Sequence, residues 1–125
     1  MNQSSTLAGR RILVVEDEFL IRLDIVSQLE AEGAEVVEAG TLAEGRRRIE
    51  MAEGAGFDGA VIDINLPDGE SWPLAEALAA RGVTLVIHSA HVGAAEAAGR
   101  LPGVHVLSKP SPEGALPRIL AAAGA

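Results

Sequence analysis

The feature that most constrains the fold is a regular alternation of short apolar runs with longer segments of helical pattern. Five runs rich in Val, Ile and Leu recur along the chain, and helix-forming residues fill the intervals. The runs are Ile12–Val15, Glu35–Ala39, Gly59–Ile64, Thr84–Ser89 and Val104–Ser108. Apolar strands that alternate with helices are typical of a parallel sheet covered on both faces. The sequence therefore predicts an α/β fold with a doubly wound, five-stranded parallel sheet.

The intervening segments carry signals for helix starts and ends. A helix over residues 18–32 ends at Gly33, and Thr41 with Glu44 forms a capping-box signature for a helix through Met51. Leu66 to Gly69 has the composition of a turn. The remaining helices are expected over residues 70–81, weakly over residues 91–100, and from Ser111 onward.

The first expected helix carries two apolar stripes. One stripe contains Ile21, Ile25 and Leu29, and the other contains Phe19, Leu23 and Val26. A helix of a globular domain usually buries one such stripe. The second stripe is therefore either a contact surface or covered by neighbouring loops, and the sequence leaves both alternatives open.

Composition narrows the class of protein. The chain has 125 residues, of which 48% are hydrophobic, which suits one domain with one core. We expect residues 1–9 to be a flexible leader and residues 10–125 to be a single domain with no effector domain.

Charge and residue usage exclude several functions. The net charge of −8 disfavours nucleic acid as a partner, because a phosphate backbone would be repelled. The absence of cysteine excludes disulfides and Cys-based zinc sites. No apolar run has the length of a membrane span, and no signal-peptide core is present, so we expect a cytoplasmic protein without membrane contact.

Polar residues end four of the predicted strands. Glu16 and Asp17 follow the first strand, Asp63 ends the third, Ser89 ends the fourth and Lys109 follows the fifth. Ligands of open α/β sheets bind at the carboxyl ends of the strands, so these side chains are expected on one rim. Three carboxylates there would suit a hard divalent cation such as Mg²⁺, and a hydroxyl and an ammonium would suit a phosphoryl group.

This combination resembles the receiver domain of two-component response regulators. The matching residues are Glu16-Asp17, Asp63, Ser89-Ala90 and Lys109-Pro110, and the resemblance runs from about Arg11 to Leu120. It implies a flavodoxin-like sheet of strand order 2-1-3-4-5 with helices on both faces. It also implies a phosphoacceptor switch in a phosphorelay rather than an enzyme, because such domains catalyse only their own phosphorylation and dephosphorylation.

The resemblance assigns an expected role to each acidic residue. Asp63 would accept a phosphoryl group from a phosphohistidine of a histidine kinase or phosphotransfer protein. Asp17 and Asp63 would bind Mg²⁺ directly, Glu16 would act through water, and the Asn65 carbonyl would complete the protein's ligands.

The resemblance likewise implies how the phosphoryl group would be held. Ser89 and Lys109 would bind its oxygens, helped by the backbone N–H groups of Asn65 and Ala90. Asn65 and His91 occupy positions that influence hydrolysis of the acyl phosphate in the family. The Lys109-Pro110 peptide bond is expected to be cis.

The sequence departs from the family on the output side. Val106 stands where receivers usually have a Tyr or Phe, and in lacking this ring the chain resembles a subset of short stand-alone receivers. Lys109-Pro110 is followed by Ser111, where the family usually has Phe. Pro117 is expected to kink or shorten the last helix. We expect output through protein–protein contact on residues 89–100 and the fifth strand, toward an unidentified downstream protein. A homodimer remains open.

Other functions fit the residues less well. A small phosphohydrolase using Asp63 would have a second acid where Asn65 stands, and a nucleotide-binding domain would have a glycine-rich turn where Glu16 to Glu18 stand. A degenerate receiver that acts without phosphorylation also remains open. His88, His91 and His105 are expected to be ordinary strand and loop residues, because no metal-ligand pattern surrounds them.

Overall fold

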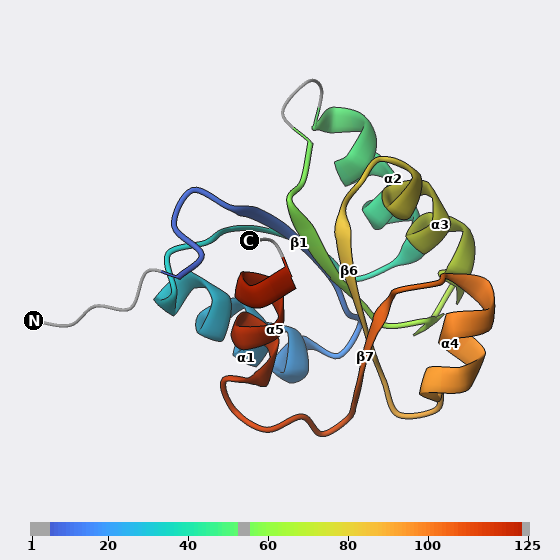
Figure 1. Ribbon diagram of the computed structural model, residues 1–125. Helices are drawn as coiled ribbons and strands as arrows, with labels where there is room; N and C mark the ends of the chain where they lie inside the picture. The colour runs from blue at the N-terminus through green and yellow to red at the C-terminus, as the bar shows by residue number, and fades with distance from the viewer. Residues whose placement is uncertain (1–5, 53–55, 124–125) are drawn as a thin grey trace, which may run out of the picture.

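The computed structural model, which describes residues 6–52 and 56–123, is a parallel sheet between two layers of helices (Figure 1). The strand order is β2-β1-β3-β6-β7, and every neighbouring pair in this sheet is parallel. The strands are β1 Arg11–Val15, β2 Glu35–Ala39, β3 Gly59–Ile62, β6 Thr84–Ser89 and β7 His105–Ser108. In chain order this is 2-1-3-4-5, so the predicted fold class and strand order are confirmed.

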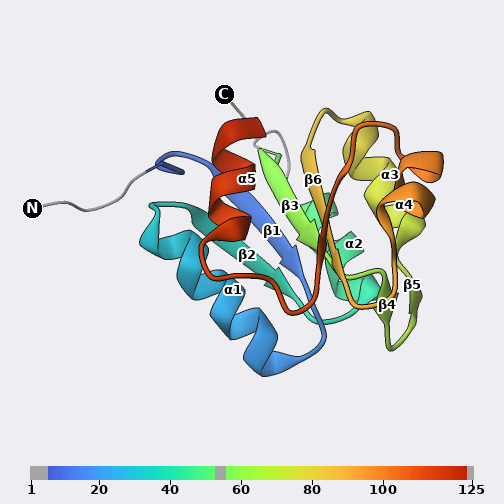
Figure 2. The ribbon, with the colours of Figure 1, turned by 60° about the horizontal axis from the view of Figure 1, so that its bottom comes forward.

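The helices divide between the two faces of the sheet, as Figure 2 shows. One face is covered by α1 (Phe19–Ala31) and α5 (Ala115–Ala123). The other face is covered by α2 (Leu42–Met51), α3 (Trp72–Ala80) and α4 (Ala94–Arg100). Among the described residues, no helix has the length and apolar character needed to cross a membrane.

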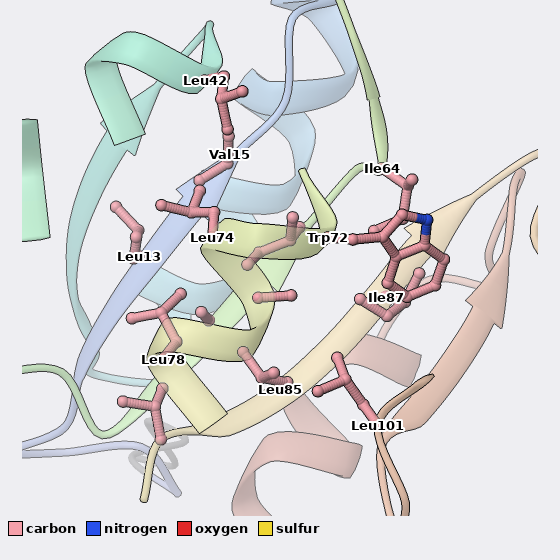
Figure 3. Packing of buried hydrophobic residues seen from close by; sticks show 14 of the residues in the cluster. Leu13, Val15, Leu42, Ile64, Trp72, Leu74, Leu78, Leu85, Ile87 and Leu101 are labelled. Carbon is pink, nitrogen blue, oxygen red and sulfur yellow. The ribbon is translucent and has the colours of Figure 1, made fainter. Parts of the chain in front are cut away.

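Alternation along the strands explains why the central strands are largely apolar. In β1, Leu13 and Val15 belong to the core cluster under α2 and α3, which Figure 3 shows around Leu74. Ile12 and Val14 belong to the second cluster, under α1 and α5. Successive side chains of a strand point to opposite faces, so a central strand covered on both sides, such as β3, is apolar at every position, whereas the edge strands β2 and β7 also carry exposed polar residues.

The turn after β3 differs from the prediction. The third strand ends at Ile62 rather than Ile64, and the next helix begins at Trp72 rather than at residue 70. The reason is a small antiparallel hairpin of β4 (Asn65–Leu66) and β5 (Gly69–Glu70), which takes up the residues between them.

The last two helices also begin later than expected. Helix α4 begins at Ala94 rather than His91, and α5 begins at Ala115 rather than Ser111. Pro117 consequently lies in the first turn of α5, where its missing N–H removes no intrahelical hydrogen bond. The helix is therefore shorter than predicted.

The segment before β1 is partly packed against the domain. Leu7 falls in the expected leader, yet its side chain is fully buried and its N–H donates to the Glu32 carbonyl at 2.9 Å. Residues 1–5 of that expected leader lie outside the described residues.

The second apolar stripe of α1 is largely uncovered. Phe19 and Leu23 are 61% and 49% exposed, whereas Val26 is buried with the first stripe. The adjacent Leu20 is also exposed. The alternative that neighbouring loops cover this stripe is therefore wrong for Phe19 and Leu23.

Candidate functional site

The parallel register of β1 and β3 brings two acids together at the carboxyl edge of the sheet. Val15 pairs with Ile62, so Glu16 and Asp63, which follow them, leave the sheet side by side. The N–H of Asp63 donates to the Val15 carbonyl at 2.9 Å, which extends the ladder by one bond.

Three carboxylates share this edge. One carboxylate oxygen from each of Glu16, Asp17 and Asp63 lies within 4.8 Å of the others. Glu16 and Asp63 are buried, at 1% and 6% exposure, and Asp17 is exposed. Since carboxylates are the protein ligands that Mg²⁺ uses, the donor set fits a divalent cation whose open side faces solvent.

Lys109 connects the two buried acids. Its Nζ lies 2.8 Å from Glu16 Oε1 and 2.9 Å from Asp63 Oδ2. Its backbone N–H donates to the Ser89 carbonyl at 3.2 Å, which holds the Lys109 backbone beside the end of β6. The Lys109-Pro110 peptide bond is cis, as predicted.

Burial and pairing shift the ionisation of this group. Burial raises the pKa of Glu16, although the hydrogen bonds from Lys109 and from the Glu18 N–H oppose it. Burial alone would lower the pKa of Lys109, but its hydrogen bonds to Glu16 and Asp63 outweigh that effect and the pKa is raised. The ammonium therefore stays charged between the two acids, and Glu16 accepts a proton more readily than an exposed glutamate.

The other predicted site residues flank the same edge. Ser89 is buried at the end of β6, and its Oγ accepts a hydrogen bond from the His91 N–H at 3.3 Å. Ala90 and His91 follow it and are exposed. Asn65 is exposed, and its N–H donates to Asp63 Oδ1 at 3.2 Å.

The histidines are not ligands of this site. Among the described residues, Glu16, Asp17 and Asp63 form the only group of three side chains placed to share a metal ion. His88 lies buried in β6 with its Nε2 3.1 Å from Ser111 Oγ. His91 and His105 are exposed.

Two residues that contact the site were not predicted from the sequence. Ser71 is fully buried, and its Oγ donates to the Asp63 carbonyl at 2.7 Å. Arg22 of α1 donates to the Glu16 carbonyl at 2.7 Å and to Glu38 Oε1 at 3.1 Å. Neither contact leaves a sequence pattern, because each joins segments that meet only in the folded chain.

The fold and this edge together define a flavodoxin-like α/β phosphoacceptor switch domain, in which strand ends bring acids and a lysine together. The chain belongs to the response regulator receiver domain family, whose sequence model matches residues 12–121. The resemblance found in the sequence is thereby confirmed.

Individual relatives are similar over different lengths. The chain is 32% identical over 78 residues to the transcriptional regulatory protein PdtaR of Mycobacterium tuberculosis, with 62% of this chain and 37% of PdtaR covered. It is 34% identical over 94 residues to the sensor protein TorS of Escherichia coli, with 74% of this chain and 10% of TorS covered. The matches thus span well under half of these curated relatives.

Solved structures agree over nearly the whole chain. A CheY-like receiver domain protein from Methanospirillum hungatei superimposes with a TM-score of 0.80 and 28% identity, covering 92% of this chain and 93% of that one. A response regulator receiver protein from Sinorhizobium medicae superimposes with a TM-score of 0.79 and 27% identity, covering 93% and 97%.

Proposed function

We propose that Asp63 is the phosphoacceptor of this two-component switch and takes its phosphoryl group from a phosphohistidine of a histidine kinase or phosphotransfer protein. The observation that carries the proposal is the placement of Asp63. Its carboxylate lies at the sheet edge, held by the Lys109 ammonium at 2.9 Å and the Asn65 N–H at 3.2 Å, among two further acids. Such fixed donors position an anionic nucleophile and its anionic reaction partner.

The transfer step forms one bond and breaks one. A carboxylate oxygen of Asp63 bonds to phosphorus, the phosphorus–nitrogen bond of the phosphohistidine breaks, and its electron pair returns to the imidazole. The Lys109 ammonium and the Ser89 hydroxyl are the groups that would bind oxygens of the transferred phosphoryl group, with the N–H groups of Asn65 and Ala90. Hydrolysis by water would reset the switch, and Asn65 and His91 would influence its rate.

The residues present fit a magnesium ion. Asp17 and Asp63 would hold it directly, Glu16 would act through water, and the Asn65 carbonyl would complete the set. When bound, Mg²⁺ neutralises charge and aligns the phosphoryl oxygens. The chain's own contribution is to keep three carboxylates clustered around one ammonium.

The exposed stripe of α1 supports a docking role toward the phosphodonor. Phe19, Leu20 and Leu23 are exposed, and Leu20 also lines a cleft of about 490 Å³ that reaches Lys109 and Pro110. A partner bound there would bring its phosphohistidine to the rim. On the output side we propose residues 89–100 and β7 as the contact surface for a downstream protein or a second copy, in the cytoplasm.

Replacing the acceptor tests this function. We expect wild-type protein to be phosphorylated by acetyl phosphate with Mg²⁺, and Asp63→Asn to give no label, because an amide oxygen is a poor nucleophile. Asp68→Asn is the matched control, since Asp68 is an exposed acid in the adjacent turn. Asp17→Ala should lose both the label and the magnesium binding seen by calorimetry. Full labelling of the Asp63→Asn protein would overturn the proposal.

A further inference from the structure

Ser71 directly precedes α3, yet its side chain does not cap that helix. A serine at this position normally accepts a hydrogen bond from a backbone N–H of the first turn, which stabilises the start of the helix. In this domain the side chain makes no such bond. Its hydroxyl is instead fully buried and donates to the Asp63 carbonyl at 2.7 Å.

This contact closes a set of bonds around the backbone of Asp63. On one side, the Asp63 N–H donates to the Val15 carbonyl of β1 at 2.9 Å. On the other, the Asp63 carbonyl accepts from the Ser71 hydroxyl, and the Ser71 N–H donates to the Ile64 carbonyl at 2.9 Å. The peptide that carries the acceptor is therefore fixed between β1 and the start of α3.

The orientation of the Asp63 side chain depends on the same peptide. Asn65 N–H donates to Asp63 Oδ1 at 3.2 Å, and Asn65 lies in the hairpin that connects Ile64 to Ser71. Without the Ser71 hydroxyl, the Asp63 carbonyl loses its buried hydrogen-bond donor. The peptide group between Asp63 and Ile64 is then free to tilt. A tilt would move both the Asn65 N–H and the carboxylate that it orients.

We infer that Ser71 is a positioning residue for phosphoryl transfer at Asp63, an inference that rests on the proposed function. Ser71 acts through the backbone of Asp63 and does not touch the phosphodonor. In-line attack on phosphorus requires close alignment, and misplacement of a reacting group by about 1 Å costs up to about 100-fold in rate. Loss of the Ser71 hydroxyl removes a hydrogen bond to the backbone carbonyl of Asp63 and leaves its carboxylate in place, so it is expected to cost less than that.

Phosphorylation kinetics of Ser71 variants test the inference. With acetyl phosphate and saturating Mg²⁺, we expect Ser71→Ala to lower the maximal rate about tenfold. The acetyl phosphate concentration that gives the half-maximal rate should not change, because Ser71 does not contact the phosphodonor. Ser71→Cys keeps the size of the side chain but donates weakly, so it should be slow as well. Thr41→Ala is the matched control, since it removes one side-chain to backbone bond, to Glu44 at 3.1 Å, away from Asp63.

The outcomes separate this inference from the proposed function. Slow Ser71→Ala and Ser71→Cys proteins, beside a Thr41→Ala protein with the wild-type rate, support it. Wild-type rates in both Ser71 variants overturn it while leaving Asp63 as the acceptor. An equal loss of rate in Thr41→Ala also overturns it, because the effect would then reflect general loss of stability. Wild-type protein that takes no label on Asp63 overturns the proposed function, and this inference falls with it.

Discussion

At the scale of single residues, burial raises the pKa of Glu16 and lowers the pKa of His88. Glu16 is 1% exposed and shares Lys109 with Asp63, so an acid that would repel its neighbours is tolerated at the end of β1. His88, two residues beyond Val86 on the same face of β6, is also buried, and its Nε2 lies 3.1 Å from Ser111 Oγ. Its Nδ1 has no hydrogen-bond partner among the described residues.

His88 makes stability depend on pH. Burial lowers its pKa below 6.5, the nearby Lys109 charge lowers it further, and Asp63 and Asp24 oppose this. Because the folded state binds the proton less readily than the unfolded chain, the contribution of His88 is present above pH 6.5 and is lost as pH falls through its folded pKa. We expect the urea midpoint to fall between about pH 7.5 and about pH 5.5, and to fall less in His88→Leu.

Glu16 has a raised pKa, so its contribution to stability changes in the opposite direction and is lost as pH rises through that pKa. Both proteins contain Glu16, so comparing their slopes isolates His88. Equal pH slopes for wild type and His88→Leu would show that the folded and unfolded states bind the His88 proton equally, which would contradict the lowered pKa.

The site residues could be predicted from sequence to the extent that strand ends define them. Glu16, Asp17, Asp63 and Lys109 each follow an apolar run, so the rule for parallel sheets was enough to place them together. Ser71 could not be found in this way. Its hydroxyl reaches Asp63 only because the hairpin returns the chain, and the sequence predicted a helix that already included Ser71.

At the scale of elements, long periodic segments were predicted well and short ones were not. The five strands of the main sheet and all five helices were expected, because apolar runs and caps mark them. The cap of α2 is one example, because the Thr41 side chain accepts a hydrogen bond from the Glu44 N–H as the capping-box signature predicts. The Glu44 carboxylate accepts from the N–H of Gly40 rather than from that of Thr41. The β4–β5 hairpin has two residues per strand, too few to show any period.

Helix α4 is short and its composition limits its stability. A side chain added at Gly99 would meet no atom within 4 Å, so Gly99→Ala should stabilise the protein by roughly 0.5–1 kcal/mol through helix propensity. Gly103→Ala is the contrasting variant. It also points into open space, but its φ of +84° should make alanine destabilising by about 1 kcal/mol. Urea unfolding measures both, and a destabilised Gly99→Ala protein would contradict the account of α4.

At the scale of the whole molecule, the two core clusters hold the sheet between its helix layers and leave the carboxyl edge free for chemistry. The strand order was implied by resemblance to the receiver family, since the alternation of elements alone does not fix it. We expect the path from this edge to an output surface to differ from the family's usual one. Val106 replaces the aromatic residue and is half-buried against the core under α4.

Because Val106 has no ring to move, we expect Ser89 to respond to a bound phosphoryl oxygen and to draw Ala90 and His91 with it. We expect beryllofluoride with Mg²⁺ to slow or redistribute amide hydrogen exchange over residues 89–100. A contact between α3 and α4 offers a second route for the signal, because the Arg100 guanidinium lies 4.7 Å from the centroid of the Trp72 ring. Exchange that changes only in residues 64–71 would show that the signal leaves through the hairpin.

The most direct measurement of the central claim is chemical mapping of the phosphorylated residue. An acyl phosphate on a carboxylate is reduced by borohydride to an alcohol, so a modified aspartate becomes homoserine and can be located by peptide mass spectrometry. After incubation with acetyl phosphate and Mg²⁺, the account predicts homoserine at position 63 and unmodified Asp17 and Asp68. Homoserine at position 17, or modification distributed over several exposed acids, would contradict the claim that Asp63 is the acceptor of this switch.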